Sequence, residues 1–87
     1  MPVIEIYTQP GCPYCADALA LLQRKRAPFR QIHAPHGTPE RAQAIARSGR
    51  GTVPQIFIDG QPVGGCDDLY ALDAAGRLDA LIAGAGP

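Results

Sequence analysis

The chain has 87 residues, of which 46% are hydrophobic and 18% charged, and eight basic residues balance eight acidic ones. This length supports one small hydrophobic core, so we expect residues 1–87 to form a single domain with a frayed tail at 83–87. The composition excludes a disordered chain. The absence of net charge provides no general attraction for nucleic acid or for an anionic membrane, so neither is an expected partner.

The N-terminal residues lack the basic and apolar segments of a signal peptide. No stretch of the chain approaches the roughly 20 apolar residues that span a bilayer. We therefore expect a cytoplasmic protein. Thiols are kept reduced in that compartment, so the three cysteines do not indicate a structural disulfide framework.

The first predicted elements are a strand and a helix. Residues 3–8 alternate and are rich in β-forming side chains, which indicates a strand. Residues 13–26 carry apolar side chains at helical spacing, and Pro13 suits the first turn because its missing N–H costs nothing there. The helix should end at Ala27, because a residue before proline is pushed out of the α region. The apolar stripe consists of Ala16, Leu19, Ala20 and Leu22.

A second strand and a second helix follow. Residues 29–33 predict a short strand. Thr38 is a typical N-cap with Pro39 behind it, and Gly49 lies where glycine commonly ends a helix, so we expect a helix between them. The side chains expected on its inner face are Ala42, Ile45 and Ala46.

The last third of the chain predicts a hairpin and a final helix. Asp59-Gly60 is a strong hairpin signal between strands at 55–58 and 61–64. Leucines at helical spacing from Asp67 onward predict a helix that is interrupted at Gly76. A strand–helix–strand crossover makes a parallel pair, and the hairpin adds antiparallel strands. The sequence therefore predicts an α/β fold, a mixed four-stranded sheet in the order β-α-β-α-β-β-α, flanked by helices.

Two cysteines three positions apart lie where the first strand meets the first helix. The unpaired N–H groups and the dipole of the helix start favour an anion at Cys12, so we expect its pKa to fall from about 8.5 to about 7 or below. Cys15 lies one turn further on, on the same face but deeper and within disulfide reach. We therefore expect Cys12 to attack disulfides and Cys15 to resolve the mixed disulfide.

A zinc site is the alternative use of cysteines at this spacing. A closed structural site needs four ligands, and the remaining candidates, Cys66, His33 and His36, form no second paired motif. A C-x-x-C pair at a helix start favours redox chemistry, so we expect no metal site. Cys66 itself is typical of a small buried residue, and oxidation or glutathionylation of its thiol is the alternative.

Four segments together carry a resemblance to a known family. They are Tyr7-Thr8, Cys12-Pro13-Tyr14-Cys15, Thr52-Val53-Pro54 and Gly64-Gly65-Cys66-Asp67-Asp68-Leu69. With these motifs the chain resembles the dithiol glutaredoxins, most closely the bacterial glutaredoxin 3 type, from about Val3 to Ile82. The resemblance implies the thioredoxin fold, with a cis peptide bond before Pro54.

The resemblance also implies an activity and a binding groove. It implies a monomeric oxidoreductase that uses glutathione as co-substrate, holds no tightly bound cofactor, and reduces oxidised or glutathionylated proteins. The Val53 backbone would bind the cysteine portion of glutathione, the amides of Cys66 and Asp67 its γ-glutamyl carboxylate, and the Asp67 side chain its ammonium. Taken without the resemblance, Asp67 or Asp68 is a helix cap, and capping is compatible with binding. Further groove residues implied are Tyr14, Thr52, Pro54 and Gly65, with Asp68 contributing less.

Gln9 and Arg41 lie at the glycine end of the implied groove. The family often has a lysine where this chain has Gln9, so the hold on the glycine carboxylate should be weaker here. Arg41 stands where relatives carry glutamine or arginine facing that carboxylate, which would compensate. From the residues alone, a solvated helix face is an alternative interpretation of Arg41.

Two other functions remain open. An iron–sulfur cluster carrier would bridge one cluster between two Cys12 thiolates and two glutathiones, but cluster-carrying relatives usually lack the second cysteine or the proline after the first. This chain keeps both Pro13 and Cys15. An electron donor reduced by thioredoxin reductase is disfavoured by the glutathione elements at 52–54 and 64–68.

Overall fold

A computed structural model describes residues 2–84 of the chain. Its elements are β1 (Ile4–Thr8), α1 (Pro13–Arg24), β2 (Arg30–His33), α2 (Pro39–Ser48), β3 (Gln55–Ile58), β4 (Gln61–Gly64), α3 (Cys66–Ala74) and α4 (Arg77–Ile82). This is the predicted order, with the last helix divided at Gly76. Of the tail predicted to fray, the N–H of Ala83 donates to Asp79 at the end of α4, and residues 85–87 lie outside the described residues.

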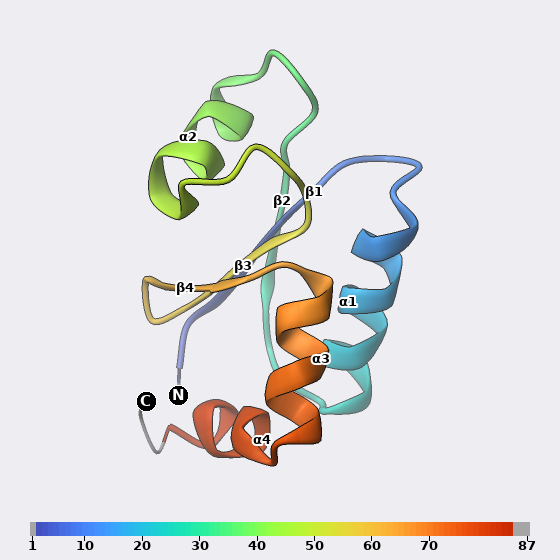
Figure 1. The fold of residues 1–87 in the computed structure, drawn as a ribbon, viewed down its shortest axis with the longest axis vertical. Coiled ribbons are helices and arrows are strands. Elements are labelled where there is room, and N and C mark those ends of the chain that lie inside the picture. Colours follow the sequence, from blue (N-terminus) through green and yellow to red (C-terminus); the bar gives the residue numbers. More distant parts are fainter. Residues whose placement is uncertain (1, 85–87) are drawn as a thin grey trace.

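The strands form one mixed sheet in the order β2-β1-β3-β4 (Figure 1). β1 pairs with β2 in parallel and with β3 antiparallel, and β3 pairs antiparallel with β4. The turn between β3 and β4 has positive φ angles at both Asp59 (51°) and Gly60 (79°), as a type I′ hairpin requires. The predicted mixed sheet is confirmed.

Helices cover both faces of the sheet. On one face, isoleucines of β1 and β3 pack with leucines of α1, α3 and α4. On the other face, Tyr7 and Phe57 meet edge to face with ring centroids 5.6 Å apart and pack against Ala44 of α2. Figure 1 shows α1 and α3 side by side, with α2 across the sheet from them. No helix within residues 2–84 is long and apolar enough to cross a membrane.

The ends of α2 follow the local sequence signals. Thr38 Oγ1 accepts the N–H of Arg41 at 3.2 Å, and Pro39 occupies the first turn. Gly49 adopts the left-handed conformation (φ 75°) and its N–H donates to the carbonyl of Ile45. Both predicted caps are confirmed.

The predicted inner face of α2 is wrong. Ala42, Ile45 and Ala46 are exposed, Ile45 by 43%, whereas Arg41 and Ala44 are buried. Arg41 and the half-buried Arg47 share the inner face with Ala44, because distant parts of the fold supply hydrogen-bond partners for the two arginines. Those partners are invisible to a pattern of apolar spacing.

Arg47 shows how a charged residue of α2 covers the apolar sheet. Its guanidinium donates to the carboxylate of Glu5 at 2.9 and 3.3 Å and to the hydroxyl of Tyr7 at 2.9 Å. The guanidinium carbon also lies 4.0 Å from the centroid of the Phe57 ring. The hydrogen-bonded ion pair with Arg47 lowers the pKa of Glu5. Together the three contacts hold α2 against β1 and β3.

Helix α1 differs from its prediction in length and in the face it buries. It ends at Arg24, because Arg26 has a left-handed backbone (φ 53°). Ala16 is exposed rather than part of the buried stripe, and Leu19 is only half-buried. The fully buried side chains are Cys15, Ala18, Leu21 and Leu22.

Candidate functional site

Cys12 and Cys15 lie at the N-terminus of α1. Cys12 is the N-cap, with an extended backbone, and its sulfur accepts the N–H of Cys15 at 3.1 Å. Pro13 occupies the first turn and needs no acceptor. Cys12 is half-buried, whereas Cys15 is 3% exposed. The outer sulfur is therefore supported by a helix-terminal amide, and the second cysteine lies beneath it, as predicted.

The two cysteines differ in their chemistry. Burial, followed by the neighbouring Cys12 sulfur, raises the pKa of the Cys15 thiol to about 12. Such a thiol stays protonated at neutral pH, and only a thiolate attacks a disulfide. The geometry therefore favours Cys12 as the first nucleophile and Cys15 as a thiol that acts after it.

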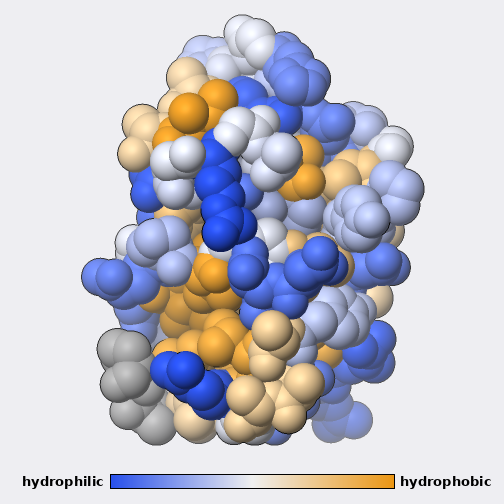
Figure 2. Space-filling view, in the orientation of Figure 1, coloured by the Kyte–Doolittle hydropathy of each residue, from blue (hydrophilic) through white to orange (hydrophobic). Residues whose placement is uncertain are grey.

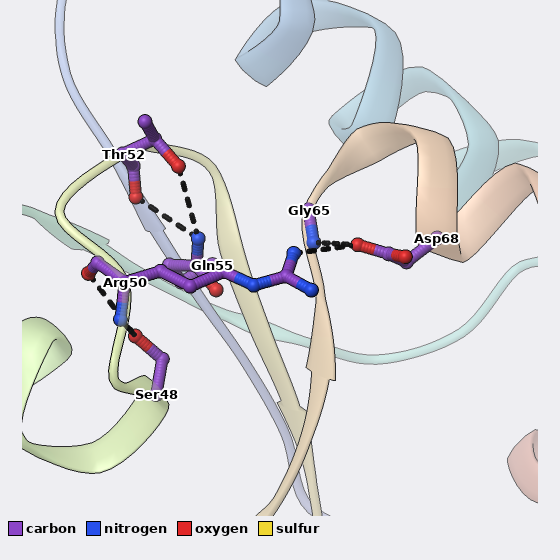
Figure 3. Close-up of polar contacts among 6 residues, drawn as sticks. All are labelled: Ser48, Arg50, Thr52, Gln55, Gly65 and Asp68. Atoms are coloured by element: carbon purple, nitrogen blue, oxygen red, sulfur yellow. Dashed lines mark hydrogen bonds and ion pairs between the residues drawn. The ribbon is translucent and has the colours of Figure 1, made fainter.

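The loop of residues 50–54, here called the cis-proline loop, lies beside Cys12. The Cys12 sulfur is 3.8 Å from the carbonyl oxygen of Val53, and the peptide bond between Val53 and Pro54 is cis, as the resemblance implies. The side-chain amide of Gln55 donates to the Thr52 carbonyl at 3.1 Å (Figure 3). Because Gln55 is buried, this bond fixes the loop from inside the fold.

The N-terminus of α3 stands across from the cis-proline loop. Gly65 is the N-cap, and its N–H donates to Asp68 Oδ2 at 2.9 Å (Figure 3). Gly64 has a φ of 112°, and a Cβ there would collide with the Asp68 carboxylate. Of the two predicted caps, Asp68 makes the contact, and Asp67 is exposed. Cys66 is 7% exposed, and burial raises the pKa of its thiol.

These segments enclose a cavity of about 280 Å³. It brings together every predicted groove residue except Gln9 and Arg41, and it adds Arg50, which the sequence analysis missed. The signal that could have found Arg50 is its position two residues before the Thr52-Val53-Pro54 motif. The lining consists of Tyr14, Arg50, Thr52, Val53, Pro54, Gly65, Cys66, Asp67 and Asp68.

A larger cavity of about 500 Å³ lies between the β3–β4 hairpin and helices α3 and α4. Figure 2 shows apolar side chains gathered in the lower half of this face, where β4, α3 and α4 lie. None of the three cysteines lines this cavity. The smaller cavity is the one beside Cys12, because its lining residue Val53 has its carbonyl oxygen 3.8 Å from the Cys12 sulfur.

Arg41 is buried and ties three loops together. Its Nη1 donates to Gln9 Oε1 at 2.8 Å and to the Ala34 carbonyl at 2.9 Å, and its Nη2 donates to the Gly51 carbonyl at 2.9 Å. With 6% exposure, it does not lie on a solvated helix face, so that alternative is wrong. Through Gln9 and Gly51 it joins the segment leading to Cys12 to the cis-proline loop.

The histidines are placed apart from this site. His33 and His36 are both exposed. Among residues 2–84, no group of three or more His, Cys, Asp or Glu side chains is arranged to hold a metal ion.

Comparison with known proteins, by sequence and by structure, finds similarity to glutaredoxins. The sequence model of the family described as Glutaredoxin matches residues 4–63. The chain is 55% identical over 82 residues to glutaredoxin 3 of Escherichia coli (strain K12), covering 94% of this chain and 99% of that protein. It is 61% identical to the glutaredoxin of Brucella melitensis, whose solution structure matches with a TM-score of 0.78 over 91% of this chain and 86% of that one. The crystal structure of a buckwheat glutaredoxin–glutathione complex shares the fold, with 24% identity and a TM-score of 0.83 over 95% and 78% of the two chains.

Proposed function

Because this chain belongs to the glutaredoxin family and is therefore a thiol–disulfide oxidoreductase, we propose that it takes its electrons from glutathione and reduces protein disulfides and protein–glutathione mixed disulfides. The observation that carries the proposal is the cavity of about 280 Å³ beside Cys12. Its volume lies just below the usual range for small-molecule sites, roughly 300–1,000 Å³. It is large enough for part of a tripeptide.

The cavity offers a partner for each polar group of the γ-glutamyl-cysteine half of glutathione. The Val53 backbone lies beside the Cys12 sulfur, where the cysteine portion must sit for sulfur exchange. The first amides of α3, at Cys66 and Asp67, lie in the helix turn that has no intrahelical acceptor, and they are suited to the γ-glutamyl carboxylate. The exposed carboxylate of Asp67 is suited to the ammonium. The buckwheat relative of the same fold was solved with glutathione.

The first route needs one cysteine of the protein. The Cys12 thiolate attacks the glutathione sulfur of a protein–glutathione mixed disulfide, and the protein thiolate leaves and takes up a proton. A second glutathione thiolate then attacks the glutathione sulfur held by Cys12. Glutathione disulfide leaves, and the Cys12 thiolate is restored, supported by the amide of Cys15.

The second route uses both cysteines on a protein disulfide. Cys12 attacks one sulfur of the substrate and forms a mixed disulfide, while the substrate S–S bond breaks and the other sulfur leaves as a thiolate that takes up a proton. Cys15 loses its proton and attacks the Cys12 sulfur, which releases the second substrate thiol and leaves a Cys12–Cys15 disulfide. Two glutathione molecules reduce that disulfide in turn. The raised pKa of Cys15 keeps it from competing in the first attack.

The glycine end of glutathione would lie toward Gln9 and Arg41. Three N–H groups of the Arg41 guanidinium bond to protein oxygens and its Nε–H is buried, so its contribution to a ligand is mainly the positive charge it places beside Gln9. Both cysteines and both cavity walls come from one chain, which supports a monomer as the working unit. We place this activity in the cytoplasm, where the glutathione pool is reduced.

The test is reduction of a peptide–glutathione mixed disulfide by glutathione, coupled to glutathione reductase. Wild type, Cys12→Ser and Cys15→Ser are compared. We expect activity to be lost in Cys12→Ser and kept in Cys15→Ser, whereas reduction of a protein disulfide should need both cysteines. A wild type that is inactive here but is reduced by thioredoxin reductase would refute glutathione as the electron donor.

A further inference from the structure

Arg50 is the single basic residue among the described residues that line the cavity beside Cys12. We propose that Arg50 binds the α-carboxylate of the γ-glutamyl residue and so makes the cavity selective for glutathione over thiols that lack this group. The inference rests on the proposed function, because it assumes that glutathione occupies the cavity.

The backbone of Arg50 is anchored while its side chain reaches across the cavity. The N–H of Arg50 donates to Ser48 Oγ at 3.0 Å, and that hydroxyl donates to the Ala44 carbonyl at 2.7 Å. Figure 3 shows the Arg50 side chain extending from this anchor at the start of the cis-proline loop to Asp68 of α3. The guanidinium therefore reaches from the wall formed by the cis-proline loop to the wall formed by α3.

The contact that Arg50 makes with Asp68 is one that a ligand can join. Arg50 Nη1 lies 2.9 Å from Asp68 Oδ2, the same oxygen that accepts the N–H of Gly65. The side chains of the pair are 55% and 43% exposed, so this ion pair is solvated and contributes little to stability. Within residues 2–84, the guanidinium has no other hydrogen-bond partner, and a guanidinium carries five donors.

The other two arginines of this region cannot serve in its place. Arg41 donates hydrogen bonds to Gln9 and to two backbone carbonyls, and Arg47 donates hydrogen bonds to Glu5 and Tyr7. Both are fixed by the fold before any ligand arrives. Arg50 is held by one solvated carboxylate and by its backbone, so it can turn toward a second carboxylate.

A γ-glutamyl group matches this end of the cavity because it carries a carboxylate and an ammonium group on the same carbon. Its α-carboxylate would accept from the first amides of α3 and from the Arg50 guanidinium, which suits carboxylate geometry. Its ammonium would meet Asp67. Asp68 keeps its bond to Gly65 throughout, so α3 stays capped while Arg50 contacts the ligand. A thiol without the α-carboxylate would lose the contacts with Arg50 and with the α3 amides and would keep the ammonium contact with Asp67.

The test compares two mixed disulfides of one peptide. In the first the partner is glutathione; in the second it is 4-aminobutyryl-cysteinyl-glycine, which lacks only the α-carboxylate and keeps the ammonium. The coupled assay gives kcat/KM for wild type, Arg50→Ala, Arg50→Lys and the control Arg77→Ala, an exposed arginine that lines the other cavity.

We expect Arg50→Ala to lower kcat/KM for the glutathione substrate about tenfold, equivalent to about 1.4 kcal/mol, and to leave the analogue unchanged. Arg50→Lys should recover part of the loss, and Arg77→Ala should change neither substrate. An equal loss on both substrates would overturn the inference, because Arg50 would then act through the loop. An unchanged Arg50→Ala would also overturn it while leaving the proposed function intact. A wild type with no glutathione-dependent turnover would refute the proposed function itself.

Discussion

Replacing Arg41 with methionine separates two roles for this residue, a clamp within the protein and a contact for glutathione. Methionine has a similar length and keeps the apolar part of the side chain. The change removes the donors for Gln9 Oε1 and for the carbonyl oxygens of Ala34 and Gly51. Because the site is buried, water cannot easily replace them.

The expected loss of stability follows from these three bonds. At about 1.5 kcal/mol for each charge-assisted bond, they contribute about 4.5 kcal/mol, and burial of the methionine side chain offsets about 1.5 kcal/mol of that. The net loss is about 3 kcal/mol, a large share of the roughly 5–10 kcal/mol that holds a domain of this size folded. It should lower Tm by about 15 °C.

Urea denaturation followed by circular dichroism measures the free energy of unfolding of Arg41→Met and wild type. Arg41→Lys should lie between them, and Arg24→Met, at an exposed position of α1, should match wild type. Because the clamp joins the segment before Cys12 to the cis-proline loop, kcat/KM should fall for disulfides with and without glutathione. Wild-type stability together with a higher KM for glutathionylated substrates alone would refute the clamp and assign Arg41 to the ligand.

Two further predictions concern a distant ion pair and the order of thiol reactivity. Arg47→Met should lower the free energy of unfolding by about 2 kcal/mol at neutral pH, as measured in urea. The ion pair lowers the pKa of Glu5 below its ordinary value of 4.5. Its contribution to the free energy of unfolding is therefore complete above pH 4.5 and is lost as the pH falls through the folded-state pKa. A difference between Arg47→Met and wild type that stays constant in acid would contradict this. Brief alkylation at neutral pH, followed by peptide mass spectrometry, should label Cys12 first. Burial raises the pKa of the Cys15 thiol to about 12 and also raises the pKa of the Cys66 thiol. Earlier labelling of either buried thiol would contradict the assignment of Cys12 as the first nucleophile.

Short-range signals predicted the elements of the fold because each depends on a few neighbouring residues. The Thr38 hydroxyl caps the helix that begins at the next residue, and Asp59-Gly60 closes a hairpin whose strands directly flank it. The division of the last helix at Gly76 is of the same kind. Such features need no knowledge of distant contacts.

The inner face of α2 could not be predicted from spacing, because its partners lie far away in the sequence. Arg47 is accommodated by Glu5, 42 residues earlier, and Arg41 by Gln9, 32 residues earlier. Without those oxygens an arginine belongs on the surface, and Ile45 would belong inside. Contacts with these distant residues therefore place the arginines on the inner face and Ile45 on the surface, which is the reverse of what apolar spacing predicts.

The candidate site was more predictable than the helix face that supports it. Its walls are two short segments, at 52–54 and 64–68, whose motifs can be recognised without a structure. Arg50 was missed because its significance depends on Asp68, 18 residues further on, which the sequence presents only as a cap. The structure shows that the two side chains meet across the cavity (Figure 3).

The most direct test of a glutathione-binding cavity is to identify which half of a mixed disulfide stays on Cys12. Cys15→Ser, which cannot resolve the intermediate, is mixed with a peptide–glutathione disulfide, quenched with acid and analysed by mass spectrometry. We predict that glutathione remains attached to Cys12 and that the peptide is released as a thiol. Attachment of the peptide to Cys12, with glutathione released, would show that the cavity does not select glutathione and would contradict the proposed function.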